Sequence, residues 1–256
     1  DAAVKTINIL GGNALSEFEM SGSGLIDDIS TDQTIDASTF VGFVELNLAT
    51  EAFDSSLTIK GGASTKDQVT TTIADEDNKI ASMTGIETLV VNSTNNDPSA
   101  SIDLTNVTGL TTVSAKFAGT GQGDQIEIDK LPAGTNVKVT STNTADVLDL
   151  GAADASSTTT AVTVEVSAMA SGTSTLDIDA AGVETFTLYN KSGAAANNFN
   201  LGGVTPTTDS KTKIIVTGVG ATLKSLDTNV DTVDATGATG AITIAAADRP
   251  DTAMTI

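Results

Sequence analysis

The sequence predicts an all-β protein, built as a parallel β-solenoid in which short strands stack coil upon coil. Three observations support this fold: a β-forming composition, short alternating runs at even intervals, and repeated motifs. Threonine accounts for 43 of the 256 residues, and β-branched residues suit pleated strands better than helices. The apolar residues are mostly Val, Ile, Leu and Ala, with seven Phe, one Tyr and no Trp. Such a composition favours thin aliphatic layers between stacked strands.

Short alternating runs follow one another at intervals of about ten residues, and Gly, Asn, Asp, Ser and Thr lie between them as turns require. Even spacing of this kind also fits a β-sandwich, which remains the alternative fold. The expected strands are Lys5–Leu10, Phe43–Leu48, Leu57–Lys60, Glu87–Val91, Gln125–Asp129, Asn136–Thr140, Ala161–Val166, Thr185–Tyr189, Lys213–Thr217 and Ala241–Ala245.

Internal repetition favours the solenoid over the sandwich. Ile35–Leu46, Ile102–Val113 and Val233–Ile244 share one pattern: a β-branched residue, Asp, a small or apolar residue, Ser or Thr, three variable residues, Gly, and then alternation. Gly85–Val91 and Gly182–Leu188 form a second pair of copies. Each unit supplies a strand whose apolar side chains stack inward.

The copies are unevenly spaced, so the expected solenoid is irregular. We expect a strand and loop segment at 1–34 that continues from a longer chain, a repetitive solenoid at 35–192, a loop at 193–211 and a final β block at 212–256. No long amphipathic helix is present, and Ser16–Met20 fits a loop or a helical turn equally well.

Composition excludes several functions. The chain has 33 acidic and 12 basic residues, for a net charge of −21, whereas nucleic-acid binding needs clustered Lys and Arg. No apolar stretch approaches the length of about 18 residues that a membrane span needs. The absence of Cys and His removes thiolate sites, the usual general base and every Ser-His-Asp arrangement. The sequence therefore predicts a non-enzymatic protein, and a lyase or hydrolase on a β-helix is disfavoured.

Acidic corners are the candidate metal sites. Asp outnumbers Glu by 24 to nine, and a short carboxylate in a turn can reach a hard cation such as Ca²⁺. Turn capping, in which Asp accepts backbone N–H groups, is the alternative role. The candidate Ca²⁺ ligands precede or follow alternating runs and are Asp32, Asp67, Asp124, Asp129, Asp146 and Asp149.

Other acids have a different expected role. Asp36, Asp103 and Asp234 each precede a Ser or Thr by two residues, a spacing that favours a structural turn over metal ligation. Asp177 and Asp179 lie on the same face of a strand. We do not interpret them as a catalytic pair, because carbohydrate-cleaving solenoids carry aromatic platforms that this chain lacks.

Several phrases resemble the degenerate repeats of calcium-dependent bacterial surface-layer (S-layer) and RTX-type secreted surface proteins. They are Thr84–Leu89, Thr108–Val113, Gly182–Thr187 and Leu226–Gly240, and the likeness extends over most of Ile35–Ala246. The tight nonapeptide of that family is not intact. Its nearest counterpart, Gly119–Glu127, keeps the first Gly, the Asp and the apolar residue and misplaces the rest, so irregular Ca²⁺ sites are expected.

The resemblance implies a right-handed solenoid with Ca²⁺ along its turns, type I secretion, and an extracellular location on the cell surface. It also implies self-assembly into a homo-oligomeric lattice, with attachment to cell-surface polysaccharide through regions outside this segment. Thr/Asp/Gly-rich repeats also occur in adhesins and phage decoration proteins, so a module that binds a host receptor or glycan is the alternative function.

Overall fold

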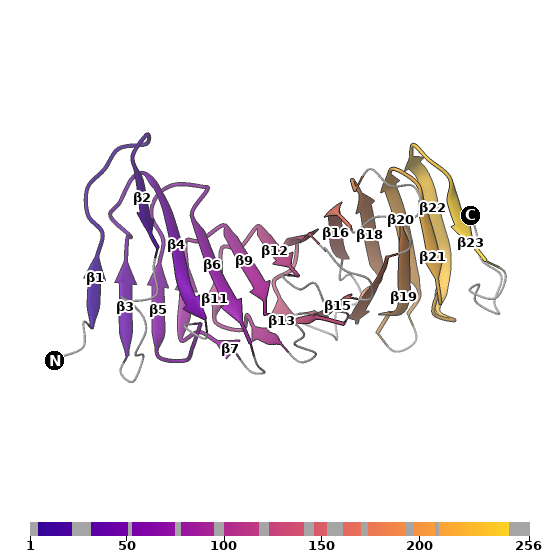
Figure 1. Ribbon diagram of the computed structural model, residues 1–256, viewed down its shortest axis with the longest axis horizontal. Helices are drawn as coiled ribbons and strands as arrows, with labels where there is room; N and C mark the ends of the chain where they lie inside the picture. The colour runs from indigo at the N-terminus through magenta and orange to yellow at the C-terminus, as the bar shows by residue number, and fades with distance from the viewer. Residues whose placement is uncertain are drawn as a thin grey trace.

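The computed structural model describes residues 5–21, 32–50, 53–74, 78–94, 100–117, 123–140, 146–152, 161–169, 174–192, 197–207 and 210–245. Within these ranges the chain consists of β-strands and turns, and every strand pair is parallel. The strands stack side by side along an elongated molecule (Figure 1). The predicted β-solenoid is therefore confirmed, and none of the described segments is a helix that could cross a membrane.

The strands form three sheets. Sheet A has five strands: β1 (Thr6–Asn8), β3 (Gln33–Asp36), β5 (Leu57–Lys60), β8 (Ser82–Thr84) and β11 (Val107–Thr108). Sheet B has ten strands: β2 (Glu17–Met20), β4 (Phe43–Thr50), β6 (Gln68–Ile73), β9 (Thr88–Ser93), β12 (Thr112–Lys116), β14 (Asn136–Thr140), β16 (Ala161–Ala168), β18 (Thr185–Asn190), β20 (Thr212–Gly218) and β22 (Val230–Ala238). Sheet C has eight strands: β7 (Asn78–Lys79), β10 (Ser101–Asp103), β13 (Gln125–Leu131), β15 (Asp146–Ala152), β17 (Thr175–Ala181), β19 (Asn198–Thr205), β21 (Ala221–Lys224) and β23 (Ile242–Ile244).

The core is a set of aliphatic ladders. Because side chains alternate between the two faces of a strand, every second residue points inward, and parallel register places equivalent residues of successive coils in contact. Sheet B stacks Val69, Leu89, Val113, Val137, Val164, Leu188 and Val216. Each of these side chains is fully buried. Burial of one such residue stabilises the fold by about 1.5–3 kcal/mol, so neighbouring coils hold each other in place.

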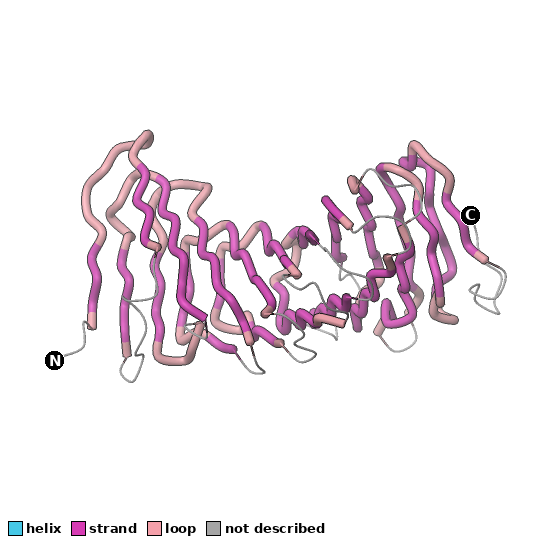
Figure 2. The backbone as a smooth tube through the Cα atoms, viewed as in Figure 1, coloured by secondary structure: helices cyan, strands magenta, loops and turns pink. Residues whose placement is uncertain are grey.

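The cross-section of the solenoid changes along its length. Sheet A ends at β11 and sheet C begins at β7, so only the coils around β8 and β11 contribute to all three sheets. From β13 onward, sheets B and C face each other across one core. The stack is bowed, with the bend near β13 and β15 (Figures 1 and 2). The predicted irregularity is thus a change from coils with sheets A and B to coils with sheets B and C.

Two expectations require correction. The loop expected at 193–211 contains strand β19, whose Phe199, Leu201 and Val204 point into the core. Asn flanks Phe199, and the adjacent Gly202 and Gly203 interrupt the alternation before Val204, which masks the strand pattern. Glu17–Met20 is strand β2, not a loop or a helical turn. It pairs in parallel with β4, and its Glu17 and Glu19 face outward beside Phe43 and Glu45 of that strand.

Candidate functional site

The repeated Asp-x-Ser/Thr motif forms a corner that joins adjacent coils. In the first copy, Asp36 Oδ1 accepts hydrogen bonds from the backbone N–H of Ser38 at 3.0 Å and from its hydroxyl at 2.6 Å. Its other oxygen, Oδ2, accepts one from Nζ of Lys60, at 2.9 Å in the next coil. One carboxylate therefore closes its own turn and binds a lysine of its neighbour.

The other two copies repeat this arrangement. Asp103 accepts from the backbone N–H of Thr105 at 2.7 Å and from Lys79 Nζ at 2.7 Å. Asp234 is bound in the same way by Thr236 and, at 3.0 Å, by Lys213 Nζ.

The electrostatics of these corners favour the charged carboxylates. Hydrogen bonds from Ser38 and Lys60 lower the pKa of Asp36 to about 2. Burial would raise the pKa of Asp103, but the hydrogen bonds from Lys79 and Thr105 outweigh it and lower that pKa to about 2. Thr236 and Lys213 lower the pKa of Asp234 to about 2. The three acids have the structural role that their spacing predicts.

Asp67, one of the candidate Ca²⁺ ligands, is a buried cap between coils. Its Oδ1 accepts the backbone N–H of Val44 at 2.9 Å and its Oδ2 that of Gly62 at 2.6 Å. The backbone N–H of Asp67 donates to Glu87 Oε2 at 2.9 Å. Burial raises the pKa of Asp67 despite these hydrogen bonds. The carboxylate is thus engaged with backbone groups of two coils, which is the capping role that the sequence left open.

Glutamates of the second repeat pair play a comparable part, which the sequence pattern alone did not reveal. Glu87 binds the backbone of Asp67 in the preceding coil, and Glu184 Oε1 accepts from the Thr207 hydroxyl at 2.6 Å in the following coil. Each glutamate precedes a strand of sheet B at a corner. The shared Gly-apolar-Glu-Thr sequence was the available signal for this role.

The remaining candidate ligands are not gathered into one site. Asp32 is exposed immediately before β3. Asp124 and Asp146 are fully buried at the start of β13 and β15, in successive coils of sheet C. Asp129 and Asp149 lie on the same two strands but on the outer surface.

Sheet C carries an outward cluster of acids, which we name the acidic face: Glu127, Asp129, Asp149, Asp177 and Asp179. Glu127, Asp149 and Asp179 occupy equivalent register positions on β13, β15 and β17. Asp177 precedes Asp179 by two residues on the same strand. Because neighbouring parallel strands lie about 4.8 Å apart, these carboxylates form a row with one member per coil.

Burial and mutual repulsion affect the protonation of two acids of the acidic face, Asp149 and Asp179. Burial raises the pKa of Asp149, and the charges of Asp179 and Asp129 raise it further. Burial also raises the pKa of Asp179, with an added contribution from Asp177. Burial and repulsion thus both disfavour the ionised forms of Asp149 and Asp179, and a nearby cation would favour them.

Two glycines allow the carboxylates to lie close to the sheet. A Cβ at Gly203, the β19 partner of Asp179, would collide with the Asp179 carboxylate. A Cβ at Gly151 would lie 2.7 Å from Asp129 Oδ1. Both acids thus rest in space that a side chain of the next coil would otherwise fill.

Carboxylate oxygens are suitable Ca²⁺ ligands, but a bound ion requires six to eight oxygens around it. Among the described residues, no group of three or more acidic side chains is placed to hold a metal ion. The acidic face is an open row and does not enclose a cation. An ion there would have to complete its coordination with water or with groups from another molecule.

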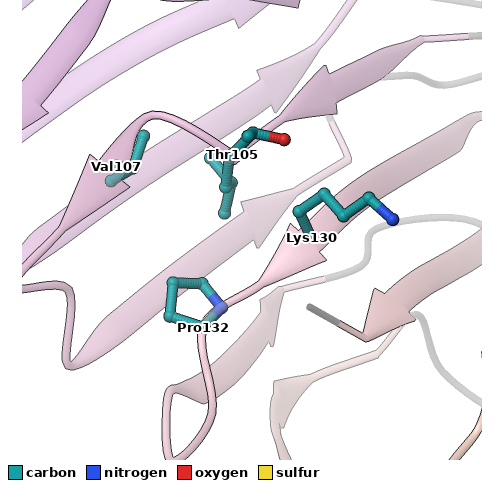
Figure 3. A pocket seen from close by; sticks show the side chains of 5 residues that line it. Thr105, Val107, Lys130 and Pro132 are labelled. Atoms are coloured by element: carbon teal, nitrogen blue, oxygen red, sulfur yellow. The ribbon is translucent and has the colours of Figure 1, made fainter. Parts of the chain in front are cut away.

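A shallow depression lies where sheet A ends. Its lining consists of Leu104, Thr105, Val107, Lys130 and Pro132, and its volume is about 340 Å³ (Figure 3). Lys130 lies at a bulge of β13 with φ of 58°, and Pro132 begins the turn to β14. The depression therefore forms at the change from three sheets to two.

Comparison with protein families, with curated proteins and with solved structures finds no match to this chain.

Proposed function

We propose that this chain is a structural segment of a secreted bacterial surface layer, in which copies assemble into a lattice that depends on Ca²⁺. The acidic face is the observation that carries the proposal. A chain with net charge −21 repels its own copies unless cations neutralise part of that charge. The cellular setting rests on the resemblance of the repeats to surface-layer proteins.

The role of the polar motifs supports a structural function. Asp36, Asp103, Asp234, Asp67 and Glu87 all use their carboxylates to join neighbouring coils. An elongated stack held together in this way is a suitable building unit for an extended array.

Calcium dependence is tested by light scattering on the purified chain in Ca²⁺, after addition of excess EGTA, and after Ca²⁺ is restored. Large particles should form in Ca²⁺, dissociate with EGTA and form again. Particles that are indifferent to EGTA would refute the role of Ca²⁺. A chain that stays monomeric in Ca²⁺ at high concentration would refute self-assembly.

The depression at the end of sheet A supports a second candidate, an adhesin or phage decoration module that binds a receptor or glycan. Leu104, Val107 and Pro132 offer apolar contact, and Lys130 offers a cation for an anionic group. Fluorescently labelled protein should then bind host cells, and Lys130→Glu should weaken that binding. Equal binding by the Lys130→Glu variant would exclude the depression as the binding site.

A further inference from the structure

Charges of opposite sign predominate on the outer surfaces of sheets B and C. From β13 onward, the inward residues of sheets B and C share one core, so their outer faces point away from each other. Sheet C presents the acidic face on β13, β15 and β17. Sheet B presents a different set of side chains on β12, β14, β16 and β18.

We name Lys116, Lys138 and Lys191 the lysine face of sheet B. Lys116 on β12 and Lys138 on β14 are exposed and lie on adjacent strands. Lys191 follows β18, with its Nζ 2.8 Å from Glu165 Oε2 and 4.5 Å from the centre of the Tyr189 ring.

The lysine face has an excess of positive charge. Glu165 is the sole acid on the outward positions of β6, β9, β12, β14, β16 and β18 that the structure describes. A hydrogen bond and the charge of Lys191, together with the charge of Lys138, lower the pKa of Glu165. The other outward residues of these strands are mainly Thr, Ser and Asn. This surface is therefore locally cationic on a strongly anionic chain.

Both faces follow parallel strands, which lie about 4.8 Å apart. Lys116 and Lys138 lie on adjacent strands, two residues apart in register, and Glu165 lies on the strand between Lys138 and Lys191. Two solenoids that lie side by side with parallel axes can thus bring the net positive lysine face against several acids at once. Complementary potentials of this kind select a partner and its register.

We propose that the lysine face of one copy docks on the acidic face of a second copy. This inference rests on the proposed self-assembly and identifies the surfaces that make the contact. The interface uses a different surface on each copy, so a docked pair leaves one face of each kind free. Growth continues in a row, and Ca²⁺ neutralises acids that the lysine face leaves unmatched.

The test uses two charge-reversal variants of the full chain in the same Ca²⁺ buffer. Lys116→Glu with Lys138→Glu makes both faces acidic, and Glu127→Lys with Asp149→Lys and Asp177→Lys makes both faces basic. Each variant alone should need at least about tenfold more protein than the unmodified chain for half-maximal assembly, a free-energy difference of about 1.4 kcal/mol. Sedimentation velocity measures assembly, and circular dichroism checks that each variant is folded.

An equimolar mixture of the two variants provides the decisive result. The acidic face of the first fits the lysine face of the second, and the two reversed faces fit each other, so the mixture should assemble as the unmodified chain does. The control is Lys5→Glu with Lys66→Glu. It changes the net charge as much as the lysine-face variant does, but at exposed positions outside both faces. It should assemble normally.

Three outcomes would overturn the inference. Either folded variant could assemble alone at the normal concentration, or the mixture could fail to assemble, or the control could fail as strongly as the lysine-face variant. In these cases the proposed surface-layer function would still stand. An unmodified chain that never assembles would refute both.

Discussion

The side chain of Thr71 points into the core between Val69 and Ile73 of β6, and its Oγ1 has no hydrogen-bond partner. A buried hydroxyl without a partner costs about 1–3 kcal/mol. Thr71→Val keeps the β-branched shape and should raise the free energy of unfolding by about 1 kcal/mol or more. Urea denaturation measures this change. The control is Thr70→Val, on the outward side of the same strand, which should change stability by less than about 0.5 kcal/mol. A loss of stability in Thr71→Val would contradict the prediction.

Gly203 and Asp179 form a second pair whose effect depends on close packing. Gly203→Ala should lower the free energy of unfolding by about 1–3 kcal/mol, because the new methyl group displaces the Asp179 carboxylate. In an Asp179→Ala background, the same substitution should cost much less. A double-mutant cycle measured by urea denaturation gives the coupling between the two sites. Equal costs in both backgrounds would show that the carboxylate is not the group that the methyl displaces.

At the scale of the structural element, the Asp-x-Ser/Thr corner makes a stability contribution that depends on pH. Asp103→Ala should lower the free energy of unfolding at neutral pH by about 1 kcal/mol, since it removes a turn cap and a partly exposed ion pair. The lowered pKa of Asp103 means that this contribution is complete above the ordinary value of 3.8 and is lost as pH falls through about 2. Thermal unfolding of both proteins across this range tests the sign.

Lys79→Met separates the two parts of that corner. It removes the ion pair and keeps the hydrogen bonds from Thr105, so it should lose less stability than Asp103→Ala. A larger loss in Lys79→Met would mean that the lysine acts through contacts other than Asp103.

The strands were predictable because their core positions alternate and because turns of Gly, Asn and Asp separate them. Leu57–Lys60 and Asn136–Thr140 match β5 and β14 at both ends. β19 was missed because its Gly202 and Gly203 lie at a bulge, where two residues interrupt the alternation.

The roles of the acids were only partly predictable. The Asp-x-Ser/Thr spacing indicates a local turn, and the structure confirms it. The lysine partners Lys60, Lys79 and Lys213 come from neighbouring coils, at separations of 24, 24 and 21 residues. The repulsion of Asp149 by Asp129 and Asp179 likewise depends on the register between coils. A local sequence pattern does not contain that register.

For the whole molecule, two sets of carboxyl groups oppose each other. Burial raises the pKa of Asp67 and Glu87, and burial with repulsion raises that of Asp149 and Asp179. These groups bind protons more tightly in the folded chain, so they favour folding as pH falls from neutral through their raised pKa values. Asp36, Asp103 and Asp234, with pKa values of about 2, act in the opposite direction at lower pH.

The melting temperature should therefore pass through a maximum at mildly acidic pH. Asp149→Asn with Asp179→Asn removes two half-buried charges and their repulsion with neighbouring acids, so this variant should be more stable than the unmodified chain at pH 7. The difference should shrink as the pH approaches the ordinary carboxyl pKa of 3.8, where both natural side chains become protonated. Calorimetry on the monomeric chain at low protein concentration measures both quantities.

Glu17→Gln with Glu19→Gln removes the same charge from exposed positions on β2 and should have a much smaller effect, because water screens exposed charges. A stability gain in the Asp149/Asp179 variant that is the same at pH 7 and pH 4 would show that the burial and repulsion of ionised carboxylates are not its cause.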